Sequence, residues 1–264
     1  MAAVIQCFNV KGGEAMNRYL RNLNKVEFVI TNACTGRCIH CSQGDHTAPS
    51  VHIDSRLAAD CVRKIARAYP IRTVMTFGGE PLLYIDAVCA VHKAAKEMGI
   101  ERRQLITNGY FSKDEGKIRA AAGALSEAGV NDILMSADAF HQETIPLEYV
   151  RMFAREAIGR GLPVRLQPAW LVSRTHDNPY NRKTRRVLDS FTDMGITEND
   201  GNVIFPEGNA LKYLKEYFTD VIPENPYADD PEDVRCVSFG PTGDVLNGNA
   251  YETDIMEILK GYAP

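Results

Sequence analysis

The stretch that decides the fold is Val26-Glu-Phe-Val-Ile30, which is followed directly by Thr31-Asn-Ala-Cys34-Thr-Gly-Arg-Cys38-Ile-His-Cys41. A short apolar run of this kind predicts a buried β-strand. The loop after it contains three of the chain's seven cysteines within eight residues. This crowding and the odd total do not suit a disulfide framework. Thiols gathered on one loop instead predict a metal site next to the end of the strand.

Further short apolar segments follow along the chain and alternate with stretches of helical spacing. Leu57, Cys61 and Ile65, for example, recur on one face of a predicted helix after the first strand. Helices are also predicted over 113–128 and 147–158, each followed by glycine as a stop signal. The expected strands are 26–30, 73–77, 104–107, 133–136, 164–167 and 203–205.

Regular alternation of strands and helices predicts an α/β fold with a parallel sheet, either open and doubly wound or closed toward a barrel. Polar and glycine-rich motifs follow the strand ends, where the ligand-handling residues of barrels gather. We therefore expect a partial (β/α)6 TIM-like barrel over 25–206. Residues 1–24 would form a short N-terminal extension, and 207–264 a C-terminal loop, a small hairpin and a helix.

Composition narrows the possible partners. The 264 residues carry a net charge of −4, and no long basic run offers a surface for nucleic acid. No apolar stretch approaches the roughly 18 residues that span a bilayer. The N-terminus also lacks a basic region followed by an apolar signal core. We expect a cytoplasmic protein without a nucleic-acid or membrane partner.

The spacing of Cys34, Cys38 and Cys41 suits a 4Fe-4S cluster in which each thiolate binds a separate iron. A protein that supplies three ligands leaves the fourth iron open, and this favours catalysis over simple electron transfer. The alternative is a structural zinc site, which needs four ligands and would take His40 or His46 as the fourth. Zinc sites more often pair two distant C-x-x-C units, whereas this loop has only one.

At this point the chain resembles the radical S-adenosylmethionine (SAM) superfamily over about residues 26–205. The three cysteines have the family's spacing and position after the first strand. Phe77-Gly-Gly-Glu-Pro81 follows the second strand and resembles the family's Gly-Gly-Glu-Pro segment. Thr107-Asn-Gly109 and Ser136-Ala-Asp138, after the third and fourth strands, are similar to further family elements.

The resemblance implies that Cys34, Cys38 and Cys41 bind the cluster and that SAM chelates its open iron. In the glycine segment, close backbone approach would provide acceptors for the SAM ammonium group. Arg165, which alternates inward on the fifth strand, is expected to pair with the SAM carboxylate. The predicted SAM-binding residues are His40, Gly78, Gly79, Glu80, Asn108, Ser136, Asp138 and Arg165.

The activity implied by the resemblance is reductive cleavage of SAM to a 5′-deoxyadenosyl radical, which then abstracts hydrogen from a substrate. Such an oxidoreductase needs an electron donor such as flavodoxin or ferredoxin. The substrate is expected to be a peptide or protein, or alternatively a small metabolite undergoing dehydrogenation or epimerisation. An activase of a glycyl-radical enzyme and a non-enzymatic structural metal-binding protein are the remaining alternatives.

Cys236 begins a segment that resembles the start of the cysteine-rich C-terminal extension of peptide-modifying members of the family. No cysteine follows it, and one thiolate cannot hold a cluster. Cys236 is therefore a degenerate remnant, a packing residue, or a catalytic hydrogen-atom donor to a substrate radical. His141, after the fourth strand, is either a base or substrate-binding residue, or an ordinary surface histidine.

Overall fold

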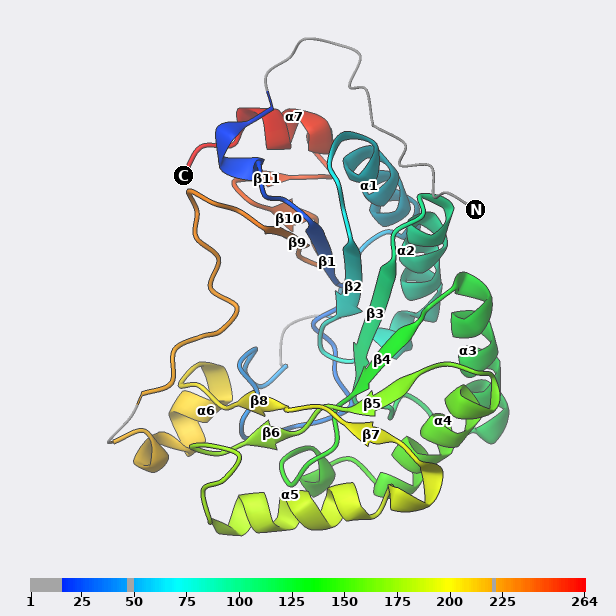
Figure 1. The fold of residues 1–264 in the computed structure, drawn as a ribbon, viewed down its shortest axis with the longest axis vertical. Coiled ribbons are helices and arrows are strands. Elements are labelled where there is room, and N and C mark those ends of the chain that lie inside the picture. Colours follow the sequence, from blue (N-terminus) through cyan, green and yellow to red (C-terminus); the bar gives the residue numbers. More distant parts are fainter. Residues whose placement is uncertain (1–15, 47–49, 220–221) are drawn as a thin grey trace, which may run out of the picture.

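The computed structural model describes residues 16–46, 50–219 and 222–264. Its central feature is a nine-stranded sheet in the order β11-β10-β9-β1-β2-β3-β4-β5-β7 (Figure 1). The six strands from β1 to β7 in this order are parallel neighbours, which confirms the expected partial-barrel α/β fold. They are β1 (Lys25–Val29), β2 (Thr73–Phe77), β3 (Arg102–Thr107), β4 (Asp132–Met135), β5 (Val164–Leu166) and β7 (Thr197–Glu198).

Four helices cover one face of the sheet (Figure 1). Asp54 and Asp114 begin the first and third of them by accepting hydrogen bonds from backbone N–H groups of the first turn. Gly129, in the left-handed conformation, ends the third. The helices are α1 (Ser55–Ala68), α2 (Ile85–Glu97), α3 (Glu115–Ala128) and α4 (Leu147–Gly159). Short 3-10 turns are η1 (Arg18–Leu20), η2 (Pro81–Tyr84), η3 (His141–Glu143), η4 (Thr192–Met194) and η5 (Lys215–Tyr217).

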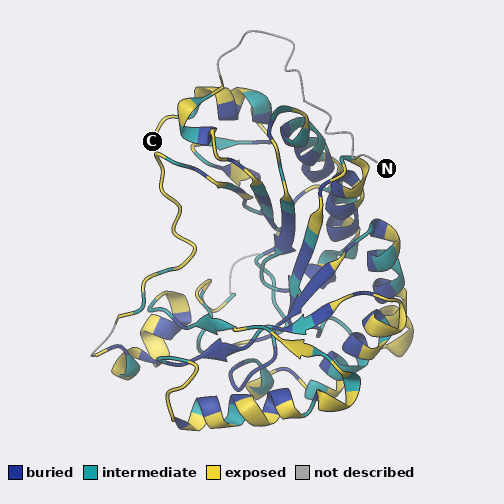
Figure 2. Ribbon diagram, in the orientation of Figure 1, coloured by how far each residue is buried: buried dark blue, intermediate teal, exposed yellow. Residues whose placement is uncertain are grey.

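The two faces of the sheet differ in chemistry. Residues paired in register point to the same side, and the side that meets the helices is apolar, with Phe28, Leu105 and Ile133 fully buried. Figure 2 shows the buried residues concentrated on the sheet and on the helix surfaces that face it. The opposite, inner side includes polar residues such as Gln104 and Asp132.

The sixth barrel strand differs from the prediction. Thr197–Glu198 pairs with β5, whereas the expected strand 203–205 contributes only β8 (Asn202–Val203). That strand pairs with β6 (Ala169–Trp170) in a separate two-stranded sheet. Periodicity missed β7 because both of its residues are exposed. The small sheet, α5 (Pro179–Asp189) and α6 (Gly208–Tyr213) lie around a second apolar core that includes Phe140, Leu171, Ile204 and Leu214.

The C-terminal hairpin forms as expected but joins the main sheet. β9 (Cys236–Phe239) runs parallel to β1, and β10 (Asp244–Val245) and β11 (Gly248–Asn249) continue antiparallel. The expected closing helix is α7 (Ile255–Gly261). Residues 222–235 form no regular element and run between α6 and β9 (Figure 1). Of the expected N-terminal extension, residues 1–15, including Cys7, lie outside the described residues.

Among the described residues, no helix is both long enough and apolar enough to cross a membrane.

Candidate active site

Cys34, Cys38 and Cys41 lie on the loop between β1 and α1, at the carboxyl end of the parallel strands. All three are free thiols. Burial raises the pKa of Cys34 to about 11 and also raises the pKa values of Cys38 and Cys41. Because thiolates are the metal ligands, such thiols need a positive metal centre to give up their protons. Without a metal, these three cysteines are therefore protonated thiols at neutral pH rather than reactive thiolates.

The three thiols share one loop, as the expected cluster requires. Among the described residues, the three cysteines do not form a group whose ligand atoms are close enough to share one ion. A zinc ion needs ligands that converge on one point, whereas a cubane takes each thiolate on its own iron. His46, a zinc ligand in the alternative prediction, places Nε2 3.3 Å from Cys41 Sγ and Nδ1 2.7 Å from the Asn32 carbonyl.

Gly78 and Gly79 pack against the backbone of the cysteine loop. The Gly79 amide donates to the Thr31 carbonyl at 2.8 Å. A Cβ at Gly78 would lie 2.5 Å from the Thr31 carbonyl oxygen, and one at Gly79 would lie 2.1 Å from that of Ala33. Gly78 also has φ +144°, a conformation that favours glycine. These glycines were expected to approach a ligand closely. In the structure they approach the backbone of the loop that carries the cysteines.

Glu80 joins the second strand end to the third. Its fully buried carboxylate accepts hydrogen bonds from Thr107 Oγ1 at 2.7 Å and from the backbone amides of Leu82 and Asn108 at 2.9 and 2.8 Å. Burial raises the pKa of Glu80 to about 7, although these hydrogen bonds oppose the shift. Because its oxygens are already hydrogen-bonded within the protein, Glu80 positions its neighbours.

Asn108 extends this connection to the cysteines. Its Nδ2 donates to Thr35 Oγ1 at 3.2 Å and lies 3.6 Å from Cys34 Sγ. Its Oδ1 accepts from the Tyr110 amide at 2.8 Å. Asn108 therefore lies in contact with Cys34, one of the three predicted cluster ligands.

A residue that the sequence did not single out holds the same loop from the other side. Asn209, at the start of α6, is buried and donates from Nδ2 to the carbonyls of Cys38 and Gly44, both at 3.1 Å. Its own amide donates to the Cys41 carbonyl at 2.9 Å. Gly208 before it permits this approach, because a Cβ there would lie 2.4 Å from the Ser42 carbonyl oxygen. No spacing signal joins Asn209 to a loop about 170 residues earlier.

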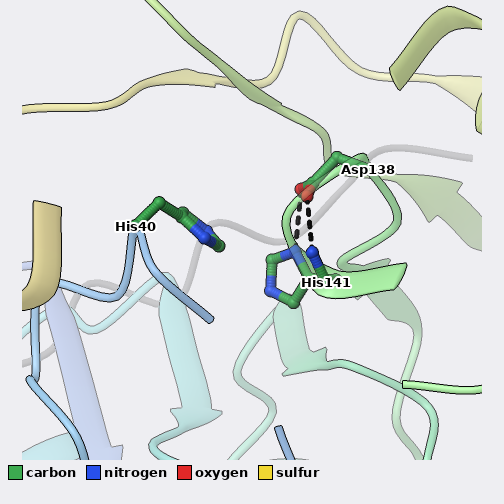
Figure 3. Close-up of side chains that lie close together, drawn as sticks. All are labelled: His40, Asp138 and His141. Atoms are coloured by element: carbon green, nitrogen blue, oxygen red, sulfur yellow. Dashed lines mark hydrogen bonds and ion pairs between the residues drawn. The ribbon is translucent and has the colours of Figure 1, made fainter. Parts of the chain in front are cut away.

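His40, Asp138 and His141 form a cluster beside the cysteine loop (Figure 3). Asp138 is fully buried, and its oxygens accept from His141 Nδ1 at 2.8 Å and from the amides of Phe140, His141 and Ala169. Burial alone would raise the pKa of Asp138, but His141 and these hydrogen bonds lower it below its usual range. Asp138 therefore orients His141 and leaves its Nε2 free.

His40 points toward this pair from the cysteine loop, with its ring centroid 4.8 Å from that of His141 and 4.9 Å from that of Phe140. Burial lowers the pKa of His40 to about 4, so the ring is neutral near pH 7. Its Nδ1 is buried and has no hydrogen-bond partner within the described part of the chain. A buried polar atom of this kind fits a site that is completed by a ligand.

Ser136 follows β4, and its amide donates to the Thr107 carbonyl at 2.8 Å. Arg165 has a different environment from the expected one. Its guanidinium donates from Nη2 at 2.7 and 2.8 Å and from Nε at 3.0 Å to the Asp132 carboxylate, near the amino end of β4. This pairing commits Nε and Nη2 to Asp132, and the expected contact of Arg165 with the SAM carboxylate stays a prediction.

Cys236 lies at the start of β9, in register with Lys25 at the amino end of β1. The cluster cysteines follow the other end of that strand, so Cys236 is remote from them. Burial, followed by the nearby carboxylate of Glu27, raises the pKa of the Cys236 thiol, which keeps its proton at neutral pH. Cys61 and Cys89 are buried in α1 and α2.

The curated relatives found by sequence comparison are described as probable GTP 3′,8-cyclases. The protein from Saccharolobus solfataricus is 28% identical over 222 residues, which cover 76% of this chain and 67% of the relative. The protein from Sulfolobus acidocaldarius is 34% identical over 122 residues, or 45% of this chain and 35% of the relative.

Solved structures share the fold at low sequence identity. Streptococcus suis SuiB bound to S-adenosylmethionine has a TM-score of 0.57 at 12% identity, over 90% of this chain and 65% of that one. Native anSMEcpe with bound AdoMet has a TM-score of 0.54 at 14% identity, over 88% of this chain and 76% of that one. This chain thus matches just under two thirds of the SuiB chain.

The family model of the radical SAM superfamily matches residues 28–167, more than half of the chain. The match spans the cysteine loop and the motifs after β2, β3 and β4. The cofactors of the family are a 4Fe-4S cluster and SAM, and the three thiols and the unpaired His40 nitrogen fit this pair. This chain belongs to the radical SAM superfamily of enzymes.

Proposed function

We propose that the protein binds a 4Fe-4S cluster through Cys34, Cys38 and Cys41 and cleaves SAM reductively to start a radical reaction on a substrate. The observation that carries this proposal is the cysteine loop itself. It supplies three thiols, and hydrogen bonds from Asn108 and Asn209 fix it from two sides. The other described cysteines lie in helices or at the opposite end of the sheet.

The proposed cofactor residues divide into two groups. Gly78, Gly79, Glu80, Asn108 and Asp138 are packed against or hydrogen-bonded to other parts of the site, so we assign them mainly to positioning. His40 Nδ1 is buried without a hydrogen-bond partner in the described residues, and Ser136 and His141 follow β4 at the same edge of the sheet. We assign these three residues to direct contact with SAM or with the substrate beside it.

When bound, the cluster and SAM supply a one-electron cleavage whose 5′-deoxyadenosyl radical takes hydrogen from the substrate. The chain's own residues orient the reactants and exclude water. The neutral His40 ring provides an acceptor or donor without adding charge, and Asp138 fixes the orientation of His141. An external electron donor such as flavodoxin or ferredoxin belongs to this proposal. So does a cytoplasmic location, because free thiols persist in reducing compartments.

For the substrate, we now favour a small molecule over a peptide. The relatives that match by sequence are named for a reaction of GTP, whereas the solved structures resemble this chain in fold alone. The polar inner face of the barrel, described below, also suits a compact polar molecule. A peptide substrate is the second candidate.

The test is anaerobic reconstitution with iron and sulfide, followed by reduction with dithionite in the presence of SAM. We expect the broad visible absorbance that is typical of iron-sulfur proteins, and we expect formation of 5′-deoxyadenosine. Cys38→Ala should abolish both, whereas Cys89→Ala, which removes a helical thiol, should retain both. A wild-type protein that binds iron but forms no 5′-deoxyadenosine would refute the proposal. Deuterium transfer from labelled nucleotides or peptides into 5′-deoxyadenosine would then choose the substrate class.

Cys236 is proposed as the hydrogen-atom donor in the same reaction, which requires a substrate that extends from the cofactors to the amino end of β1, where Cys236 lies. Its S–H bond would break as a C–H bond forms on the substrate radical, and a one-electron reductant with a proton would restore the thiol. The raised pKa supports this role, because a thiol rather than a thiolate donates hydrogen. With a substrate in hand, Cys236→Ala should still form 5′-deoxyadenosine but yield a different or unreduced product. Unchanged product would remove Cys236 from the mechanism.

A further inference from the structure

The inner face of the barrel sheet carries a buried charged network that the cofactor site does not use. Barrel interiors are usually filled by bulky apolar side chains. Here Asp132 is only 8% exposed and accepts from Gln104 Nε2 at 2.7 Å and from Arg165 at 2.7–3.0 Å. A buried ion pair rarely stabilises a fold more than apolar side chains of the same size would. Its presence inside the barrel therefore calls for a purpose other than stability.

The network fixes the Arg165 guanidinium and leaves one of its nitrogens unbonded. Arg165 uses Nε and Nη2 to bind Asp132, and its Nη1 has no hydrogen-bond partner among the described residues. About a third of the Arg165 side chain is exposed. Asp132 and Gln104 thus hold Arg165 with one donor edge free, which is the geometry that binds carboxylate or phosphate oxygens.

Arg165 lines a cavity of about 510 Å³, a volume typical of small-molecule sites. Two more arginines line it, Arg72 just before β2 and Arg102 at the start of β3. Arg102 Nε lies 3.7 Å from Asp132, and the Arg72 side chain has no ion pair within the described residues. Three arginines face two carboxylates, Glu101 and Asp132, so this lining is net positive in a chain of net charge −4.

The cavity lies on the inner face of the sheet, near the amino ends of β2, β3 and β4, whereas the candidate cofactor residues follow the carboxyl ends of these strands. Asp132 precedes Ser136 by four residues, or about 13 Å along an extended strand, and Arg165 precedes the end of its strand by one residue. A metabolite with an acidic group at the arginines would thus extend its other end toward the cofactors.

We propose that this cavity binds the anionic end of the substrate, a phosphate or carboxylate group, through Arg72, Arg102 and Arg165. Asp132 and Gln104 are positioning residues for Arg165. The inference rests on the proposed function for its identification of the ligand as substrate. It assigns the substrate to the class of acidic small molecules.

The experiment measures binding of two probes, inorganic pyrophosphate and succinate, to the reconstituted protein with SAM by calorimetry. Wild type should bind at least one probe in the micromolar to low millimolar range, and the stronger one identifies phosphate or carboxylate as the group. Arg72→Ala and Arg102→Ala should each weaken it about tenfold or more. Arg56→Ala, which removes an exposed arginine on α1, is the matched control and should bind as wild type does.

Binding of neither probe, or equal weakening by all three substitutions, would overturn the proposal. Arg165→Ala removes the main ion-pair partner of the buried Asp132 and can unfold the protein. The test therefore uses substitutions of the exposed Arg72 and Arg102. Formation of 5′-deoxyadenosine without a substrate is measured on the same wild-type sample. Probe binding without SAM cleavage would reject the proposed function alone, and SAM cleavage without probe binding would reject the anion site alone.

Discussion

Replacing Asn209 by alanine should loosen the cysteine loop without touching a cysteine. The side chain donates two hydrogen bonds of 3.1 Å to the carbonyls of Cys38 and Gly44. Asn209 is only 7% exposed. Alanine cannot replace either hydrogen bond, and the Cys38 carbonyl would keep only the 3.2 Å hydrogen bond from the Cys41 amide.

Two hydrogen bonds contribute a net ~1–3 kcal/mol, and we take the middle of that range, ~2 kcal/mol, because the Cys38 carbonyl keeps its hydrogen bond from the Cys41 amide. For a protein of this size, ~1 kcal/mol changes the melting temperature by ~2–4 °C. We therefore expect Asn209→Ala to lower the melting temperature of the cluster-free protein by ~4–8 °C. Because the loop carries all three cluster ligands, the variant should also retain less iron after reconstitution.

The assay combines thermal unfolding, iron and sulfide content, and the rate of 5′-deoxyadenosine formation. Asn225→Ala is the control, because Asn225 is only half-buried and its side chain bonds the exposed Glu207 side chain at 3.0 Å and the nearby Tyr227 amide at 2.9 Å, both away from the cysteine loop. It should change stability by less than ~0.5 kcal/mol. If Asn209→Ala matched this control in melting temperature and iron content, α6 would not support the cluster loop as argued.

Three further outcomes follow from the structure. Gly79→Ala should lower the free energy of unfolding by ~3 kcal/mol or more and lose bound iron, because the new Cβ would lie 2.1 Å from the Ala33 carbonyl oxygen. Gly159→Ala is the control, because nothing lies within 4 Å of its Cβ, and it should be nearly neutral in the same unfolding and iron assays. In denaturant unfolding, the stability difference between wild type and Asp138→Asn should be fully present above about pH 4 and shrink as the pH falls below it, since the folded state lowers the pKa of Asp138; a difference independent of pH would contradict this assignment. Cluster binding should slow hydrogen exchange in residues 31–46 but leave that of α3 unchanged, and equal exchange with and without iron would show that the loop does not bind it.

Much of the fold was predictable because its signals are local. The strands β1 to β5 are short apolar runs with glycine or polar residues at their ends, and the helices between them bury regular faces. The sixth strand was misplaced because β7 is two exposed residues long, and only its pairing with β5 makes it a strand. The parallel pairing of β9 with β1 joins residues about 210 positions apart, which no local pattern encodes.

The sequence indicated which residues lie near the candidate site better than it indicated what each of them contacts. Side chains at the ends of adjacent parallel strands must lie near one another, so the motifs after β2, β3 and β4 were expected to surround the cysteine loop. Whether an acidic side chain faces a ligand or the protein depends on donors from elsewhere in the chain. Glu80 is bound by Thr107 and Asn108, and Asp138 by Ala169.

These two buried carboxylates suggest how the site tolerates reactive chemistry. A radical attacks almost any nearby C–H bond, so small displacements of the reactants would be costly. Glu80 links the ends of β2 and β3, and Asp138 links the segment after β4 to the Ala169 amide of β6, each through several hydrogen bonds from fixed donors. Anchoring the loops through saturated, buried acceptors leaves only a few polar atoms free at the centre, among them His40 Nδ1. The proposed arginine cavity would then supply the specificity for substrate, because most polar side chains beside the cysteine loop are already hydrogen-bonded to the protein.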